Sequence, residues 1–444
     1  MPVDALTQSL PFDPANAKAA LAQLPHAAAV FALYGADTHA EPYIGRTPNL
    51  RARLERLLQP SPKHPRRLQL AGRVRRIEYR PTGSDFESLL VQFTLLEELY
   101  GPKALERMHL AAPTFIRYLG SNAYPRITVT NRPSQREADW AYGPFPSRAA
   151  AERFADEALK LFLLRRCTDD LDPNPAHPGC VYSEMKMCLA PCYQGCTDQR
   201  YNEEATAVEN FIATRGEGRL ITLRTQRDDA SAQLEFESAA ALHAQVQRVE
   251  GVRALAPELV RPLSKLRAVI LQPAANPGEV AVFVFESGRL RGPAAFSTLG
   301  MRIQNEHSGS SSLFAQPLAI EPTLEAEESW NQGSESGAIE LTENRVTAAP
   351  APQSGAGAPV RLARGLPEAR LEAAVRALAK SAQAPSATVR QGHRSLLKRW
   401  YYRPEARRPG EIFFPDDEDH WPLRAILRGI GRVAGKTIAA STKG

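Results

Sequence analysis

The stretch CTDDLDPNPAHPGCVYSEMKMCLAPC, residues 167–192, contains four of the five cysteines of the chain, and Cys196 follows four residues later. Thiolates gathered this closely usually share a metal ion or an iron–sulfur cluster. The alternatives are a disulfide pair or buried free thiols, but an intracellular disulfide would not persist. The sequence therefore favours a coordinating site and leaves iron–sulfur and zinc both open. The candidate ligands are Cys167, Cys180, Cys188 and Cys192.

Length and hydropathy place limits on the class of protein. A chain of 444 residues is long enough for roughly two to four domains, each with its own core. It has no apolar run long enough to span a bilayer, and its first residues lack the basic and apolar regions of an export signal. We therefore expect a cytoplasmic protein with no membrane partner.

Positive charge is concentrated near the N-terminus. Eleven Lys or Arg residues lie between Arg46 and Arg80, against two acids. A solvated surface is the alternative, but so dense a positive field favours a polyanion, so the sequence predicts nucleic-acid binding. The candidate DNA contacts are Arg51, Arg56, Arg66, Arg67, Arg73, Arg75 and Arg76.

The first hundred residues show the pattern of a small α/β module. The apolar run 27–35 and the segment 42–45 predict a hairpin, and the leucines of 49–58 predict a helix capped by Asn49. Alternation over 73–82 predicts a strand, and the apolar stripe of 85–100 predicts a second helix. The rest of the chain adds helical and strand segments, so the fold class is α/β (α+β) with several domains.

These residues resemble a known family. Tyr43-Ile44-Gly45 and the arginine-bearing helix 49–53 resemble the GIY-YIG nuclease domain, and residues 82–96 are similar to its metal-binding helix. With the cysteine spacing and the sequence CLAPC, the chain resembles the UvrC proteins, the excinuclease subunit of nucleotide excision repair. The resemblance implies a four-iron, four-sulfur cluster at the cysteines, with zinc as the alternative.

The resemblance also implies a nuclease site and marks two departures from it. Tyr43, Arg46 and Arg53 occupy catalytic positions, whereas Phe31 replaces the first tyrosine and Gln92 replaces the metal-binding glutamate. A neutral amide is a poor ligand for Mg²⁺ or Mn²⁺, which an active site would need. Loss of one acid–base partner alone costs roughly 10² to 10⁴ in rate. We therefore favour a partly degenerate nuclease domain over an active one.

After the cysteines, residues 220–233 and 234–255 predict a helical hairpin. Its turn resembles the UVR motif, through which UvrC proteins contact the UvrB subunit. An ordinary packing hairpin has the same apolar spacing and is the alternative. The predicted partner-binding residues are Leu234, Phe236, Ala239, Ala240 and Leu242.

The remaining sequence contains strands, a linker and a basic end. Residues 267–300 alternate as strands do, and no RNase H-like or helix-hairpin-helix domain is recognisable after them. The aromatic run 400–402 either stacks nucleic-acid bases or forms a small core. The predicted regions are 1–115 (GIY-YIG-like), 116–200 (connecting region with cysteines), 201–256 (hairpin), 257–304 (strands), 305–362 (disordered linker) and 363–444 (basic α+β).

Three functions remain open. The favoured one is a UvrC-like DNA-binding protein of nucleotide excision repair that is recruited to a UvrB-like subunit. The alternatives are an active metal-dependent endonuclease that incises damaged DNA and a non-catalytic nucleic-acid-binding adaptor outside repair.

Overall fold

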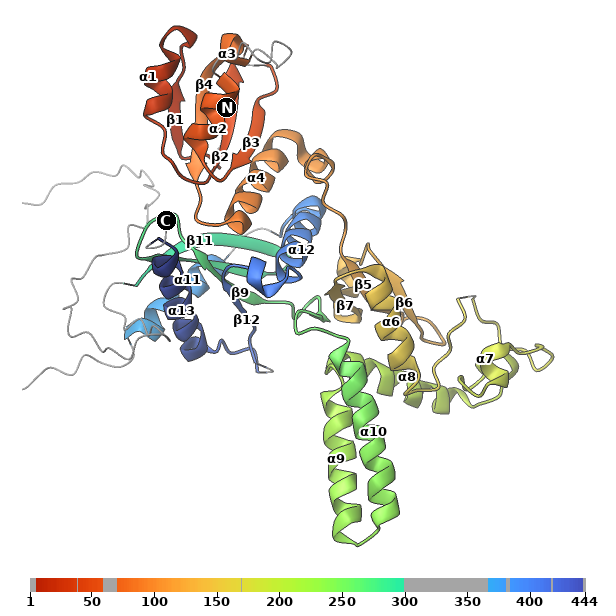
Figure 1. Ribbon diagram of the computed structural model, residues 1–444. Coiled ribbons are helices and arrows are strands. Elements are labelled where there is room, and N and C mark those ends of the chain that lie inside the picture. Colours follow the sequence, from red (N-terminus) through yellow and green to blue (C-terminus); the bar gives the residue numbers. More distant parts are fainter. Residues whose placement is uncertain are drawn as a thin grey trace, which may run out of the picture.

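The computed structural model describes residues 5–37, 39–58, 70–168, 170–298, 366–380, 384–416 and 418–441. Within these residues three four-stranded sheets are each packed against helices, which confirms a mixed α and β fold (Figure 1). No helix in these ranges combines the length and apolar character needed to cross a membrane.

The N-terminal sheet is antiparallel and has the order β1-β4-β2-β3. The predicted hairpin, the helix after it and the next strand are confirmed, whereas β1 was not predicted. Leucines of α2 pack on one face of the sheet because they recur every fourth residue, and the Asn49 side chain accepts a hydrogen bond from Ala52 N, which confirms the cap. The elements are β1 (Gln8–Pro11), α1 (Ala17–Ala22), β2 (Ala29–Gly35), β3 (Tyr43–Thr47), α2 (Leu50–Leu58), α3 (Leu70–Arg73) and β4 (Val74–Pro81).

Helix α4 (Asp85–Tyr100) belongs to two cores. The Ser84 hydroxyl caps it by accepting from Glu87 N at 3.1 Å. Val91 and Leu95 pack against β2, whereas an opposite stripe that includes Phe86 and Phe93 packs against the C-terminal part of the chain. The helix is apolar on both sides because both sides are covered.

The middle sheet has the order β6-β5-β7-β8, and its last strand returns to it after the helical hairpin. Helices α9 and α10 form this hairpin, which projects from the rest of the molecule (Figure 1). The helices predicted here are confirmed. The elements are α5 (Ala104–Arg107), β5 (Thr114–Tyr118), β6 (Ile127–Thr130), β7 (Ala141–Phe145), α6 (Arg148–Leu159), α7 (Val181–Glu184), α8 (Asp198–Ala213), α9 (Glu217–Ala232), α10 (Phe236–Ala254) and β8 (Arg261–Pro262).

The third sheet joins segments from both sides of residues 299–365. Its order is β11-β10-β9-β12, and β12 pairs antiparallel with β9, with Glu411 opposite Leu271. The strand region 257–304 and the basic region 363–444, which the sequence analysis separated, therefore share one sheet. The elements are β9 (Ala268–Pro273), β10 (Glu279–Glu286), β11 (Arg289–Ser297), α11 (Leu366–Ala379), α12 (Ala387–Tyr401), β12 (Glu411–Phe413) and α13 (Leu423–Ser441).

Helices cover both faces of this third sheet. Apolar residues of α11 and α13 pack on one face, and α12 packs on the other, where it also contacts α4 (Figure 1). Trp400 is 1% exposed within this core, and its indole N–H donates to Pro409 O at 3.2 Å. The prediction that Trp400 stacks nucleic-acid bases is therefore wrong, because its side chain is buried in the protein core. The predicted linker 305–362 lies outside the described residues.

Candidate functional site

The four predicted cysteine ligands line one small cavity. Cys180 precedes α7, and Cys192 lies in a 3₁₀ turn at Pro191–Tyr193. Ala190, just before that turn, has a φ of 57°, which reverses the chain so that Cys188 and Cys192 face the same cavity. Cys196 is not among the residues that line it. Tertiary structure thus separates the fifth cysteine from the other four.

Polar donors surround the sulfur atoms. Ala190 N donates to Cys188 Sγ at 3.3 Å, and the Arg165 guanidinium lies 3.7 Å from Cys167 Sγ. Burial, and then the charges of the other three cysteines, raise the pKa of Cys188 to about 11. A thiolate in this cavity therefore requires a compensating cation, and a metal centre supplies one. The donor set fits such a group.

The spacing of the four thiols bears on which group fits. Among the residues that the structure describes, no three His, Cys, Asp or Glu side chains are grouped as ligands of a single ion. A zinc ion with Zn–S bonds of about 2.3 Å requires sulfur atoms within about 4 Å of one another. A cluster uses the same four cysteines in another way, because each cysteine binds a separate iron.

The nuclease-like positions lie on the N-terminal sheet. Phe31 on β2 is 1% exposed, and its ring centroid lies 6.2 Å from that of Tyr43 on β3, which is 36% exposed. Gly45 lies directly opposite Phe31, and a side chain there would overlap the Phe31 ring. The structure thus places the Phe31 and Tyr43 rings close together on adjacent strands.

Arg46 is bound by an acid that the sequence analysis did not identify. It forms an ion pair with Asp85, the first residue of α4, and Asp85 also accepts from Arg403 at 2.7 Å. Burial alone would raise the pKa of Asp85, but the hydrogen bond from Arg403 and the charge of Arg46 lower it below its ordinary value. Arg403, two residues after the end of α12, therefore contacts the same carboxylate as Arg46 and ties the C-terminal part of the chain to α4.

The other catalytic candidates are half-buried on separate helices, Arg53 on α2 and Gln92 on α4. Two glutamates on α4 flank Gln92 in the sequence. Glu87 is 4% exposed, its carboxylate accepts from Gly83 N at 2.9 Å, and burial raises its pKa. Glu97 is half-buried. Glu87 therefore holds the turn before α4, which is a structural role.

The candidate DNA-binding arginines have different surroundings. Arg51 donates to Leu24 O at 2.7 Å and anchors α2 to the end of α1. Arg76 pairs with Glu78 at 3.1 Å. Arg66 and Arg67 lie outside the described residues. Arg76 is nevertheless exposed, as are Arg56, Arg73 and Arg75. Arg56 Nε donates to Ala52 O at 3.1 Å, and a terminal nitrogen of Arg75 donates to Gly72 O at 2.9 Å.

Apolar side chains are exposed at the tip of the α9–α10 hairpin. Leu234 is 71% and Phe236 is 65% exposed, and Leu234 has a φ of 61° in the turn between the helices. Ala240 is exposed, and Ala239 and Leu242 are half-buried. The five predicted partner-binding residues thus lie at or near the tip, where an apolar surface is available to another protein.

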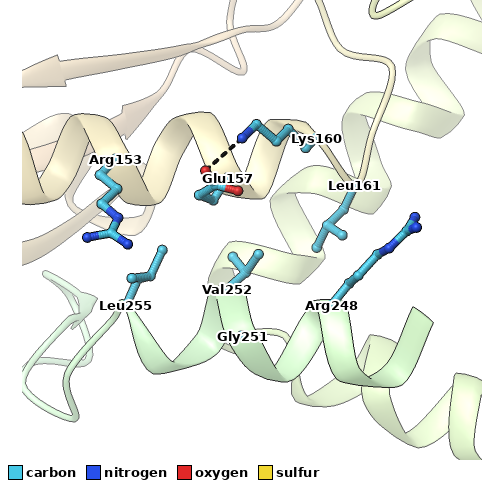
Figure 2. A pocket seen from close by; sticks show the side chains of 8 residues that line it. All are labelled: Arg153, Glu157, Lys160, Leu161, Arg248, Gly251, Val252 and Leu255. Carbon is cyan, nitrogen blue, oxygen red and sulfur yellow. Dashed lines mark hydrogen bonds and ion pairs between the residues drawn. The ribbon is translucent and has the colours of Figure 1, made fainter. Parts of the chain in front are cut away.

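A cleft of about 540 Å³ lies at the other end of the hairpin, between α6 and α10. Figure 2 shows Val252 and Leu255 on α10 and Leu161 on the opposite side, just after α6, with Arg153 and Arg248 toward the two ends of the cleft. Glu157 in this cleft pairs with Lys160 at 2.7 Å. The sequence analysis did not identify this cleft, because its two walls come from residues 153–161 and 248–255, which are far apart in the sequence.

Comparison with known proteins gives one family. Residues 114–211 match the family described as "UvrC/Cho excinuclease, middle domain". This segment contains all five cysteines and reaches into α8. No solved structure matches the chain significantly.

The similarity to whole proteins extends further along the chain. UvrABC system protein C of Alcanivorax borkumensis is 31% identical over 211 residues, which cover 48% of this chain and 34% of that protein. The protein of the same name from Haemophilus ducreyi is 30% identical over 241 residues, 54% of this chain and 38% of that protein. The chain thus spans little more than a third of the length of these relatives.

Proposed function

We propose that this UvrC-like chain is a DNA-binding protein of nucleotide excision repair whose nuclease-like module does not cut by the usual metal-dependent mechanism. The observation that supports this most is the similarity of about half of the chain to UvrABC system protein C, together with the family match over residues 114–211. The relatives are named as protein C of the UvrABC system, and the proposal extends a role in that system to this chain.

The arrangement of the nuclease-like residues supports a degenerate site. Phe31 has no hydroxyl to activate water, and Gln92 offers only a neutral amide oxygen to a hard cation. Arg46 is paired with Asp85, which it shares with Arg403, so part of its charge is already compensated before any phosphate arrives. Tyr43 and Arg53 remain. Binding a phosphate requires fewer catalytic groups than hydrolysing one, because no transition-state charge has to be stabilised.

The cysteine cavity supports a resident metal centre, for which we propose an iron–sulfur cluster held by Cys167, Cys180, Cys188 and Cys192. When bound, such a cluster ties distant segments of chain together and can exchange an electron. The chain itself contributes four thiolates, the Ala190 amide and a nearby guanidinium. Zinc is the alternative centre.

The hairpin tip supports recruitment to a UvrB-like subunit. Two large apolar side chains that are two-thirds exposed are costly unless a partner covers them. A helical apolar face of this kind docks against another helix or groove.

The test combines binding with cutting. Full-length protein is incubated with lesion-bearing and undamaged duplex in Mg²⁺ or Mn²⁺, with and without UvrB. We expect binding that prefers the lesion complex, and no nicking. Nicking that disappears on Tyr43→Phe or Arg53→Ala would establish the active endonuclease instead.

The partner is tested separately. Leu234→Ser and Phe236→Ser should weaken UvrB binding, whereas Ile221→Ser, which is also exposed but lies near the start of α9, is the matched control. DNA binding with no UvrB binding and no lesion preference would favour the adaptor outside repair.

A further inference from the structure

A row of cations runs along one side of α12. Arg390, Arg394 and Lys398 are spaced four residues apart, so they lie on the same side of the helix and span about 12 Å. Like charges at this spacing destabilise a helix. Arg403, two residues after the end of α12, is paired with Asp85, but within the described residues none of the three cations of the row forms an ion pair. The row therefore has a cost that helix stability does not explain.

Arg394 is the most enclosed member of the row. It is 7% exposed, and its Nε is shielded from solvent without a hydrogen-bond partner among the described residues. The turn at Gly288 lies against it, because a Cβ added there would be 3.4 Å from a terminal nitrogen of Arg394 and 3.0 Å from Cγ of Arg390. Its guanidinium carbon lies 6.0 Å from the ring centroid of Phe115 on β5, at the outer limit of a cation–π contact. The guanidinium is therefore confined by neighbours that compensate little of its charge.

Positive charge predominates around Arg394. Burial, and then the charge of Arg390, lower its pKa to about 10, and no carboxylate in the described part of the chain raises it. Burial, and then the charges of Arg289 and Arg291, lower the pKa of the adjacent His393. Both arginines of β11 thus lie near the same part of α12. A buried cation among other cations is unfavourable unless an anion joins them.

An anion from outside the chain matches this surface. Glu286 acts on Arg291, but it is already paired with Arg267 at 2.8 Å. A phosphate suits a guanidinium because it accepts two parallel hydrogen bonds and keeps its charge. A nucleic-acid strand suits the whole row, since it presents a phosphate about every 3.4 Å of duplex axis and so about three over the length of the row. One carboxylate of another protein would match only one of the three cations.

We propose that α12 binds the phosphate backbone of a nucleic acid through Arg394, with Arg390 and Lys398 holding neighbouring phosphates. The inference rests on the proposed DNA binding and gives it a site outside the nuclease-like module. Each phosphate contact releases counterions from the nucleic acid. It therefore contributes about 0.9 to the slope of log K against log salt for duplex DNA, and about 0.7 for a single strand.

The experiment measures binding of the full-length protein to labelled single-stranded and duplex oligonucleotides, by fluorescence anisotropy over a range of NaCl concentrations. Arg394→Met keeps a long side chain without the charge. It should weaken binding about tenfold and reduce the salt slope by roughly 0.7 to 0.9. Arg394→Lys keeps the charge and should keep most of the slope. Arg376→Met, on α11 at the opposite face of the third sheet, is the matched control and should change neither quantity.

Stability distinguishes a binding residue from a structural one. Because the charge of Arg394 is uncompensated in the free protein, Arg394→Met should melt at a temperature at least as high as that of Arg376→Met. A lower melting temperature for Arg394→Met would identify a structural cation and overturn the inference. An unchanged DNA affinity and salt slope would overturn it as well.

The remaining outcomes identify the ligand and separate this inference from the proposed function. Inorganic phosphate that raises the melting temperature of the wild type but not of Arg394→Met, with equal DNA binding by both, would assign a free anion and overturn the nucleic-acid site. Equal DNA binding with weaker UvrB binding would assign an acidic protein surface and also overturn it. A wild-type chain that binds no DNA overturns the proposed function and this inference together, whereas DNA binding that Arg394→Met leaves unchanged overturns this inference alone.

Discussion

Gly392 on α12 tests the packing of α12 against α4, which joins the N-terminal part of the chain to its C-terminal part. A Cβ added at Gly392 would lie within 3.0 Å of three ring atoms of Phe93 on α4. The Phe93 ring is fully buried and stacks edge-on against His393, with centroids 5.4 Å apart. The ring therefore has no free space into which it can move.

The magnitude follows from two opposing effects of Gly392→Ala. Overpacking a rigid core costs up to about 3 kcal/mol, whereas replacing glycine by alanine inside a helix contributes about 1 kcal/mol of stability. The net loss is about 2 kcal/mol. Because every 1.4 kcal/mol is a factor of ten, amides of α4 and α12 should exchange hydrogen about 30-fold faster.

Gly431→Ala on α13 is the matched control, because an added Cβ there has no atom within 4 Å. It should stabilise the protein by about 1 kcal/mol through the same helix preference. Hydrogen exchange read by mass spectrometry compares the two variants with the wild type. If Gly392→Ala exchanges as slowly as Gly431→Ala, the close packing of α4 on α12 is refuted.

Three further predictions concern other parts of the molecule. Cys188→Ser should abolish bound iron, whereas Cys196→Ser, outside the cavity, should retain it; equal iron content in the two variants would contradict the four-cysteine set. Burial, with neighbouring arginine charges, lowers the pKa of His393 to about 3 from 6.5. The unfolded chain therefore binds one more proton than the folded chain between these two pH values. The contribution of His393 to the free energy of unfolding should be complete above about pH 6.5 and should fall by roughly 1.4 kcal/mol per pH unit as the pH drops toward 3. His393→Gln should remove this slope from unfolding free energies measured by urea titration. Leu234→Ser and Phe236→Ser should change the unfolding free energy by less than about 0.5 kcal/mol while weakening UvrB binding at least tenfold by calorimetry, since both side chains are exposed.

The sequence alone predicts the local elements of this protein well. The apolar run before Gly35, the capped helix after Asn49 and the hairpin around Leu234 all form as expected, because period and caps act over a few residues. The short turn between Cys188 and Cys192 likewise predicts that these two thiols lie close together, whereas the same spacing between Cys192 and Cys196 does not show that Cys196 lies outside the cavity.

Contacts between distant segments were decided only by the tertiary structure. No local pattern specifies the pairing of β12 with β9 or the burial of Trp400. The same holds for the two ion pairs of Asp85, with Arg46 and with Arg403, and for the buried guanidinium of Arg165 beside Cys167. An arginine that anchors a helix and one that faces solvent have the same side chain and similar neighbours in the sequence. Their roles differ because folding buries one and exposes the other.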